Sequence, residues 1–550
     1  MQDAERTPRQ AGLRERSRGR TNVTLDGEEA VLETRTTLIN RVAIGDIVRR
    51  SAVLHPEKIA FIEDARTLTY RDFDARCNQF AHALLERGLR KGDTVACLCT
   101  NSLDFIVAAY GIAKAGLVWV PMNPLLTREQ LDYILGQVEA KLLLVDAALL
   151  PVFQGQGRAA PPVITIGAAD HAGAAGTTPF ADMLAGRPAS DPEVEIEDRD
   201  TAIIMFTSGT TAQQKGVVIS HLAVYLAALN NIIELEMRAD DVTVAILPFF
   251  HCAQHTLVTS FLTRGATQIV MRGFDAVALM ENITQHRVSW CFALPTMWRA
   301  VLDHPERSRY SFSSMRYGLY AMTPMDGETL TRLINEICPR FALSSGQTEV
   351  YPSTCVFKPE VQFSKSGQYW GEQSLTAEFQ IMDDAGHLLP RGEIGELVVR
   401  GPTVMMEYLK DPDATREARA HGWHHTGDLG LIDEDGLFLF KDRKKDMIKS
   451  GGENVASCNV EGALLGHPAV AAAAVVGLPH ARWIEAVTAF VIAKPEAGLS
   501  EAEVLAWCRE RLGLHEVPKK VVFLERFPMT ATGKVLKHML RAEYHDLFKA

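Results

Sequence analysis

A hydroxyl-rich loop that ends in a lysine follows a short apolar run. Residues 207–216 read TSGTTAQQKG, directly after the apolar residues 202–206. An apolar run of that length predicts a buried strand, so the polar loop should emerge at the end of that strand. Loops rich in N–H and O–H donors with one ammonium suit the oxygens of a polyphosphate, although a plain solvated loop is the alternative. The candidate phosphate ligands are Thr207, Ser208, Gly209, Thr210, Thr211 and Lys215.

Four further segments follow this loop in the chain. They read SGQTE at 345–349, HHTGD at 424–428, DRKKDMIKSGGENV at 442–455 and PMTATGKV at 528–535. In order and approximate spacing, the five segments resemble the signatures of the adenylate-forming (ANL) superfamily, the acyl-CoA synthetases and their relatives. LTYRDF at 68–73, KGDTVACL at 91–98 and AGLVWVPMNP at 115–124 extend the resemblance to all but about the first forty residues.

The resemblance implies a reaction in two steps. A carboxylate attacks the α-phosphorus of ATP to give an acyl-adenylate and pyrophosphate, and the thiol of CoA then displaces AMP. The first step is needed because a carboxylate is a poor electrophile and its adenylate is a good one. Mg²⁺ would spread the negative charge that develops on the departing pyrophosphate.

The resemblance also implies a role for each matching residue. Residues 207–215 would hold the β- and γ-phosphates, and Thr348 would contact the α-phosphate. Glu349 would ligate Mg²⁺, for which carboxylate oxygens are suited. Asp428 would accept hydrogen bonds from both ribose hydroxyls, and Arg443 would donate to the ribose or a phosphate. The other nucleotide-binding candidates in these segments are Ser345, Gly346 and Gln347.

Two positions near the end of the chain correspond to moving parts of the superfamily. Lys534 resembles the mobile lysine that neutralises charge in the adenylation transition state, with a surface lysine as the alternative. Lys445 corresponds to the hinge about which the C-terminal domain rotates between the two steps. That rotation would present a glycine turn to the pantetheine arm of CoA, with a mere tight turn as the alternative. The CoA-binding candidates are Gly451, Gly452 and Glu453.

The acyl pocket is expected near two segments, LPFFH at 247–251 and GLYAMTP at 318–324. His251 matches an aromatic position where the acyl and thiol paths meet, with a satisfied core histidine as the alternative. Tyr320 and Met322 stand where relatives often have a glycine-rich run, and Met322 would reshape the pocket but keep it apolar. The expected substrate is a medium- or long-chain fatty acid, with an aromatic or branched acid as the alternative.

Three positions depart from the superfamily pattern. Ala212 and Gln214 stand where glycine and proline are usual, and Ser345 stands where an aromatic ring commonly stacks on adenine. Loss of that stack should weaken ATP binding by about 1 kcal/mol. These departures keep open a non-catalytic acyl- or nucleotide-binding relative. Within the enzyme class, an adenylating enzyme that loads a separate carrier protein is the alternative to a CoA ligase.

The length and the pattern of apolar runs predict several domains, because 550 residues exceed a single hydrophobic core. Strand-like runs alternate with helical stretches up to about residue 321, which predicts parallel, helix-covered sheets. Strands with Asp/Gly turns then predict a smaller β-rich unit. We expect a disordered tail at 1–38, a large N-terminal AMP-binding α/β domain at 39–442 and a small mobile α+β C-terminal domain at 443–550, with a hinge near 443–446.

Composition limits the partners and the compartment. The net charge of −11 argues against nucleic acid or an anionic membrane as the main partner. No apolar run is long enough for a transmembrane segment. The nine scattered cysteines fit free thiols in a reducing cytoplasm. The expected partners are a carboxylic acid, ATP and CoA, and a homodimer is compatible with the resemblance.

Overall fold

The computed structural model describes most of the chain. The described residues are 41–153, 161–167, 176–207, 214–321, 324–365, 367–495, 497–529 and 535–549. Residues 42–550 form one compact unit. Several predictions lie outside the described residues: the tail at 1–38, the loop residues Ser208, Gly209, Thr210, Thr211 and Ala212, and also Met322 and Lys534.

The first of three sheets has eight strands in the order β20-β9-β8-β4-β3-β5-β6-β7. From β8 to β7 the neighbours are parallel, and β9 and β20 add antiparallel strands at one edge. The central strands are buried on both faces, which explains why they read as continuous apolar runs. The strands are β3 (Thr94–Leu98), β4 (Val118–Pro121), β5 (Leu142–Asp146), β6 (Val163–Ile166), β7 (Thr177–Pro179), β8 (Thr201–Thr207), β9 (Lys215–Ser220) and β20 (Glu407–Tyr408).

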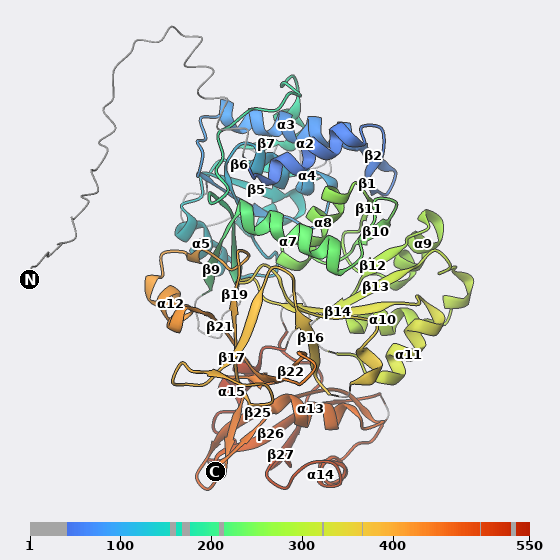
Figure 1. The fold of residues 1–550 in the computed structure, drawn as a ribbon, viewed down its shortest axis with the longest axis vertical. Helices are drawn as coiled ribbons and strands as arrows, with labels where there is room; N and C mark the ends of the chain where they lie inside the picture. The colour runs from blue at the N-terminus through green and yellow to red at the C-terminus, as the bar shows by residue number, and fades with distance from the viewer. Residues whose placement is uncertain are drawn as a thin grey trace, which may run out of the picture. The chain divides into compact units, whose positions relative to one another are not determined.

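The second sheet has fourteen strands and joins two parts that the sequence predicted separately (Figure 1). From β1 through β11, β10, β12 and β13 to β14 the neighbours are parallel, and from β14 to β18 they are antiparallel. The β-rich unit is therefore continuous with the parallel sheet. The strands are β1 (Ile59–Glu63), β2 (Arg66–Thr69), β10 (Val242–Ala245), β11 (Thr267–Val270), β12 (Trp290–Phe292), β13 (Tyr317–Ala321), β14 (Phe341–Gly346), β15 (Ser353–Phe357), β16 (Tyr369–Gln373), β17 (Glu378–Met382), β18 (Leu388–Leu389), β19 (Gly395–Arg400), β21 (His424–Ile432) and β22 (Phe438–Arg443).

Several of the helices begin at a side-chain cap. Ser102 caps α4 by accepting from the Phe105 N–H, and Thr127 forms a capping box with Gln130 at α5. The helices are α2 (Ile44–Leu54), α3 (Tyr70–Glu86), α4 (Leu103–Lys114), α5 (Arg128–Val138), α6 (Phe180–Leu184), α7 (His221–Glu234), α8 (Cys252–Arg264), α9 (Ala276–His286), α10 (Pro295–Leu302), α11 (Gly327–Glu336), α12 (Pro412–Glu417), α13 (Ser457–Leu465), α14 (Glu501–Arg509) and α15 (Lys537–Glu543).

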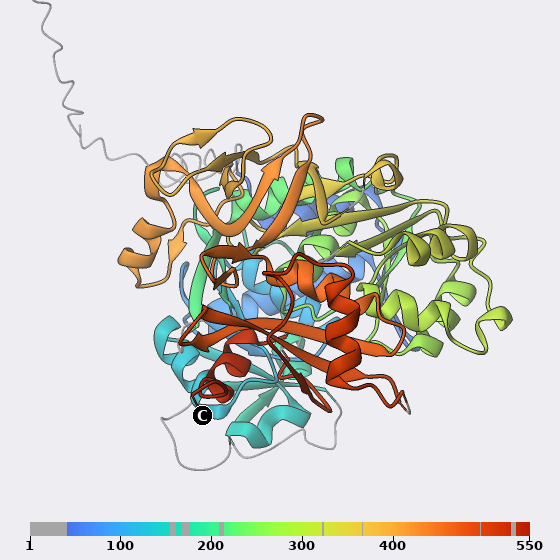
Figure 2. The ribbon, with the colours of Figure 1, turned by 90° about the horizontal axis from the view of Figure 1, so that it is seen from below.

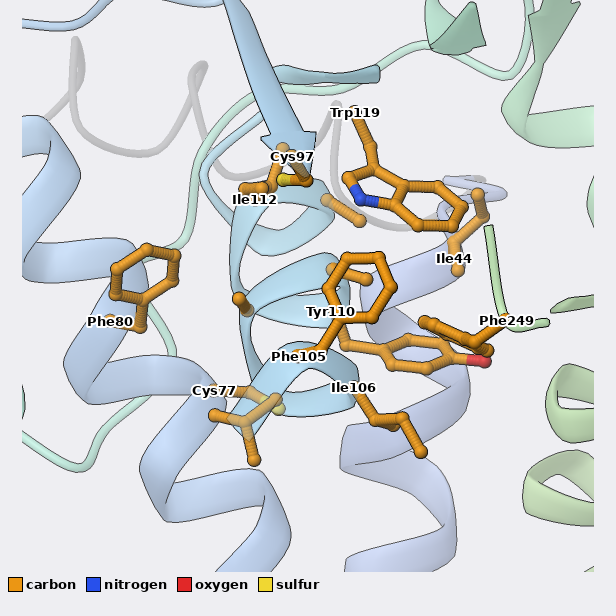
Figure 3. Close-up of a cluster of buried hydrophobic side chains, with 14 of the residues drawn as sticks. Ile44, Cys77, Phe80, Cys97, Phe105, Ile106, Tyr110, Ile112, Trp119 and Phe249 are labelled. Atoms are coloured by element: carbon orange, nitrogen blue, oxygen red, sulfur yellow. The ribbon is translucent and has the colours of Figure 1, made fainter. Parts of the chain in front are cut away.

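A cluster of aromatic side chains fixes the turn that follows β10 (Figure 3). The ring of Phe249 packs edge-on against Phe105 of α4 at 5.3 Å between centroids and lies 5.4 Å from Trp119 of β4. Its backbone N–H donates to the Asn101 side-chain oxygen at 2.8 Å. Aromatic packing of this kind is geometrically selective, so the position of His251, two residues later, is set by the core.

The C-terminal part has its own sheet (Figure 2). It also has its own core. Two clusters of buried apolar side chains are drawn wholly from residues 448–548. A separate core is one requirement of an independent domain, and the boundary near residue 443 stays a prediction. The strands are β23 (Ile448–Ser450), β24 (Glu453–Val455), β25 (Val470–His480), β26 (Ile484–Ala493) and β27 (Lys520–Phe523).

Candidate active site

The predicted phosphate loop closes a β-hairpin at the edge of the eight-stranded sheet. Strands β8 and β9 are antiparallel, and Thr207 lies opposite Lys215. The segment 208–213 between them is outside the described residues. The Tyr133 hydroxyl donates to the backbone oxygen of Gln214 at 3.4 Å, on the approach to β9. The hairpin therefore places the two ends of the predicted loop next to each other.

The SGQTE segment spans the last two residues of β14 and the tight turn that follows it. The backbone N–H groups of Val350 and Tyr351 both donate to the Gln347 carbonyl at 3.1 Å. Ser345 is buried, and a Cβ at Gly346 would overlap the carbonyl oxygen of Pro352. Only glycine fits there, because a neighbouring backbone occupies the space that a side chain would need.

The turn after β14 lies at the carboxyl end of the parallel strands β13 and β14. In α/β sheets this is the edge at which ligands bind. The two residues that leave it, Thr348 and Glu349, are both half-buried. The turn therefore presents a hydroxyl and a carboxylate at the expected edge.

Thr348 contacts the start of helix α8. Its hydroxyl lies 3.5 Å from the sulfur of Cys252. His251 caps the helix, because its Nδ1 accepts from the Ala253 N–H at 3.3 Å, and the same nitrogen lies 3.7 Å from the Cys252 sulfur. The structure thus brings the predicted residues His251 and Thr348 together through a cysteine that the sequence analysis did not identify.

Glu349 and Lys215 are joined by one tyrosine. The Tyr408 hydroxyl donates to Oε1 of Glu349 at 3.0 Å, and the Lys215 ammonium lies 4.9 Å from the centroid of the Tyr408 ring. Burial and the Glu349 carboxylate both raise the pKa of Tyr408, so its hydroxyl stays protonated and acts as the donor. Nothing in the sequence marked Tyr408, because it lies 59 residues from Glu349 along the chain.

The predicted ribose ligands form an ion pair across neighbouring strands. Asp428 of β21 lies directly opposite Arg443 of β22, and Arg443 Nε is 2.9 Å from Asp428 Oδ1. The Asp428 side chain is 5% exposed and that of Arg443 is 30% exposed. Beside this pair, Lys444 bonds Glu396 at 3.1 Å and Asp384 at 2.8 Å. In this pair the planar guanidinium of Arg443 lies beside the buried carboxylate of Asp428.

The glycine turn predicted to meet CoA is a two-residue β-hairpin. Strands β23 and β24 pair Ser450 with Glu453, and φ is +64° at Gly451 and +92° at Gly452. Positive φ at both central residues is the geometry of a type I′ turn, which favours glycine. Glu453 is exposed. The turn alone accounts for both glycines, and a contact with CoA stays a prediction.

The predicted hinge adjoins a network of charged side chains. The backbone N–H of Ser457, the first residue of α13, donates to a carboxylate oxygen of Asp442. The Lys537 ammonium bonds Glu461 at 2.7 Å and the Ser457 hydroxyl at 2.7 Å. The exposed Lys445 lies between Asp442 and this network in the chain. Lys537 was missed by the sequence analysis because its partners lie far away in the chain.

Tyr320 of β13 is fully buried, and its hydroxyl donates to Oε1 of Gln362 at 2.7 Å. Its polar end is therefore satisfied inside the protein, so any contact with an acyl chain would come from the ring. The role of Tyr320 in an acyl pocket stays a prediction, as does that of His251.

The groups at this site fit ATP and Mg²⁺. Glu349 offers carboxylate oxygens, which a small divalent cation prefers, and Lys215 offers a positive charge to phosphate. Asp428 offers acceptors to ribose hydroxyls. Each of these side chains is held by a neighbour: Glu349 and Lys215 by Tyr408, and Asp428 by Arg443.

Comparison with known proteins assigns the family. Residues 48–409 match the family of AMP-binding enzymes, and residues 459–534 match the AMP-binding enzyme C-terminal domain. The chain belongs to this family, the adenylate-forming superfamily, and is an AMP-forming acid–thiol ligase for which ATP and CoA are substrates. This assignment confirms the superfamily resemblance and favours an enzyme over the non-catalytic alternative.

Curated relatives match nearly the whole chain. The long-chain-fatty-acid–CoA ligase FadD13 of Mycobacterium tuberculosis is 35% identical over 508 residues, covering 91% of this chain and 98% of the relative. Feruloyl-CoA synthase of an Amycolatopsis species is 32% identical, covering 90% and 98%. The fatty acid–[acyl-carrier-protein] ligase ScoC of Streptomyces coeruleorubidus is also 32% identical, covering 89% and 94%.

Solved structures share the fold. The anthranilate CoA ligase AuaEII in complex with anthranoyl-AMP aligns with a TM-score of 0.83 at 26% identity, covering 91% of this chain and 97% of that one. The Mycobacterium tuberculosis fatty acyl CoA synthetase aligns with a TM-score of 0.74 at 32% identity, covering 92% and 99%. The Bacillus subtilis o-succinylbenzoate CoA synthetase with ATP and a magnesium ion aligns with a TM-score of 0.79 at 27% identity, covering 90% and 98%. The predicted α/β architecture with a smaller C-terminal part is thus confirmed.

Proposed function

We propose that this ligase converts a medium- or long-chain fatty acid to its acyl-CoA. The observation that carries the proposal is the convergence of Thr348, Glu349 and Lys215 around the end of β14, next to an apolar core. The similarity to FadD13, a ligase of long-chain fatty acids, supports the choice of acid. An apolar acyl chain, whether short or long, needs no charged group in the acyl pocket.

Each group at the site has a proposed task. Lys215 would neutralise charge on the β- and γ-phosphates, and the hydroxyls at 207–211 would donate hydrogen bonds to them. Glu349 would hold Mg²⁺, which supplies further positive charge there. Thr348 donates to the α-phosphate, where the carboxylate attacks. The Asp428–Arg443 pair orients the ribose, so the α-phosphorus is held in line with the acid. Lys534, which lies outside the described residues, supplies the positive charge that the transition state needs.

Rotation of the C-terminal domain would then exchange the two half-reactions. We take 39–442 and 443–550 as the two domains, with the hinge at 443–446. The separate cores of the C-terminal part support a rigid-body motion about that segment. In the second pose the turn at Gly451 and Gly452 would lie against the pantetheine arm, with Glu453 beside it.

The proposal is tested by pyrophosphate release with a series of straight-chain acids, measured with ATP and Mg²⁺ and with or without CoA. We expect acid-dependent release that rises with chain length into the medium or long range, and an acyl-CoA product when CoA is present. If pyrophosphate release were fastest with ferulate or another aromatic acid, the substrate would be an aromatic acid and not a fatty acid. No release with any carboxylate would reject the function itself.

A separate carrier protein is a candidate for a second acceptor beside CoA. The fatty acid–[acyl-carrier-protein] ligase ScoC supports a carrier protein as acceptor, and feruloyl-CoA synthase supports CoA. Both relatives have the same sequence identity to this chain. Mass spectrometry of the thioester formed from equal concentrations of CoA and a phosphopantetheinylated carrier decides between them. We expect acyl-CoA to predominate.

We also propose a reducing compartment, the cytoplasm, for this reaction. All nine cysteines are free thiols, and eight of them are buried. Within the described residues, no helix is long and apolar enough to cross a lipid bilayer. A homodimer stays a prediction, and light scattering of the purified protein measures it directly.

A further inference from the structure

Tyr408 stands between two charges that the proposed reaction uses. The Lys215 ammonium lies over the Tyr408 ring at 4.9 Å, and the Glu349 carboxylate accepts from the Tyr408 hydroxyl at 3.0 Å. Two opposite charges that contact one tyrosine could instead pair with each other. In the described structure Lys215 and Glu349 form no ion pair: the ammonium lies over the ring of Tyr408, and the carboxylate accepts from its hydroxyl.

The backbone around Tyr408 is held from several sides. The Met405 N–H donates to the Glu349 carbonyl at 2.7 Å, which ties the segment to the turn after β14. On its other side, strand β20 pairs with β9, and Tyr408 lies opposite Val217. The Tyr408 N–H also donates to the Thr415 hydroxyl at 2.9 Å. A residue anchored in this way keeps its side-chain direction when the ligands come and go.

The hydroxyl leaves half of the Glu349 carboxylate available. A carboxylate has two oxygens with about four lone-pair directions, and the bond to Tyr408 uses one oxygen, Oε1. Because Tyr408 holds Oε1, the orientation of the second Glu349 oxygen relative to strands β8 and β9 is also fixed. Hydrogen bonds of this kind to metal-ligating carboxylates typically change metal affinity by about 10–100-fold when they are removed.

The ring of Tyr408 contacts the Lys215 ammonium without neutralising its positive charge. A cation over an aromatic face stays fully charged, whereas a direct ion pair with Glu349 would satisfy both partners and leave neither free for Mg²⁺ or phosphate. The ring contact is weaker than the bonds that three phosphate oxygens would offer. Lys215 can therefore transfer to the phosphates when the nucleotide enters.

We propose that Tyr408 is a positioning residue for MgATP, which aims Glu349 at the metal ion and keeps Lys215 available to the β- and γ-phosphates. This inference rests on the proposed function, since it assumes that ATP and Mg²⁺ bind at Lys215 and Glu349. Its two halves are separable, because the hydroxyl acts on Glu349 and the ring acts on Lys215.

The test compares Tyr408→Phe, which removes only the hydroxyl, with Tyr408→Leu, which also removes the ring. The readouts are the Mg²⁺ concentration that half-saturates the ATP-induced thermal shift in the absence of any acid, and the kcat and KM for adenylate formation. For Tyr408→Phe we expect the half-saturating Mg²⁺ concentration to rise about 10-fold, with kcat at saturating Mg²⁺ changed less than about 3-fold. For Tyr408→Leu we expect the KM for ATP to rise by a further factor of about 3, even at saturating Mg²⁺.

The matched control is Tyr225→Phe, because Tyr225 is also half-buried and also lies under a cation, Arg50, at 5.4 Å. It should leave both readouts unchanged. In a Glu349→Gln background, Tyr408→Phe should add less than about 2-fold to the Mg²⁺ requirement, since the hydroxyl acts through Glu349. The far-UV circular dichroism and ligand-free melting temperature of each variant report whether it is folded.

Two failures are distinguishable. If wild-type protein shows no Mg²⁺-dependent thermal shift with ATP and forms no adenylate, the proposed function fails. If wild-type protein shows both and Tyr408→Phe has the same Mg²⁺ requirement, this inference alone is overturned. A uniform loss in kcat with an unchanged Mg²⁺ requirement would also overturn it, because a merely structural tyrosine gives that pattern.

Discussion

Arg541 in helix α15 donates to Oδ1 of Asp446, the last residue of the predicted hinge, at 2.6 Å. Both side chains are largely buried, with exposures of 27% and 12%. Burial alone would raise the pKa of Asp446, but the Arg541 bond and the charges of Arg541, Lys537 and Lys445 together outweigh it, and the pKa lies below its ordinary value. Because α15 begins three residues after Lys534, this pair links the hinge to the segment that carries the expected catalytic lysine.

Replacement of Arg541 by Met should destabilise the protein and slow adenylation. The change leaves a buried carboxylate at Asp446 without its cation, which should lower the free energy of unfolding by about 2–3 kcal/mol. Adding Asp446→Asn should restore at least half of that loss, as a double-mutant cycle in denaturant would measure. The exposed pair Arg511–Glu510 is the control, and Arg511→Met should change stability by less than about 1 kcal/mol. If Arg541→Met and Arg511→Met lowered the free energy of unfolding equally, the Arg541–Asp446 pair would not link the hinge to α15 as argued.

Replacement of Lys534 by Ala should separate the two half-reactions. Adenylation needs a positive charge at the α-phosphate, so acyl-adenylate formation should fall by about 10²–10³-fold. Thiolysis of a supplied acyl-adenylate by CoA should stay within about 3-fold of wild type, since Lys534 would be withdrawn in that pose. Single-turnover measurements of each step provide the comparison. Equal loss in both steps would reject the two-pose scheme.

Much of the fold could be predicted from local patterns. The apolar runs at 94–99, 201–206 and 317–321 each became a strand within a residue or two of the predicted ends. The structure places Thr348 and Glu349 directly after β14 and pairs Asp428 with Arg443, and their roles at a nucleotide site stay predictions. The strand predictions succeeded because burial on both faces leaves a signal within a few residues.

Contacts between distant segments could not be predicted in this way. Tyr408 belongs to a two-residue strand that pairs with β9, and no local periodicity marks so short an element. The contact of Cys252 with Thr348 spans 96 residues, and that of Arg541 with Asp446 spans 95. The periodicity of apolar residues shows which face of a segment is buried, but not which other segment lies beside it. Such partners are therefore known only from the assembled fold.

Replacement of Gly346 by Ala should disrupt the turn that presents Thr348 and Glu349. An added methyl group would overlap the carbonyl oxygen of Pro352, and backbone cannot move aside as a flexible side chain can. We expect loss of the ATP-induced thermal shift and a lower melting temperature. Gly327→Ala is the control: it opens α11, has open space around it, and should be neutral or stabilise by up to about 1 kcal/mol. A fully active Gly346→Ala protein would show that the turn has more room than the structure gives it.

Replacement of His424 by Phe should make the protein more stable in mild acid. Within the described residues neither ring nitrogen of His424 has a hydrogen-bond partner, and the side chain is buried beside Arg419, Glu396 and His425. Burial, with a smaller contribution from His425 and Arg419, lowers the pKa of His424 to about 4. The folded protein therefore keeps this imidazole neutral, whereas the unfolded chain binds a proton below its ordinary pKa of about 6.5.

The sign of the effect follows from proton binding. Between about pH 6.5 and pH 4 the unfolded state binds more protons at His424, so wild-type stability falls as the pH falls, by up to about 1.4 kcal/mol per pH unit from this residue. Phenylalanine removes that dependence and the two unsatisfied nitrogens, so the variant's advantage should grow by about 2 kcal/mol from pH 7 to pH 5. Urea denaturation at both pH values measures it, with His515→Phe at an exposed site as the control. An advantage that does not change with pH would mean that His424 is already charged in the folded protein, with a partner that stabilises its proton.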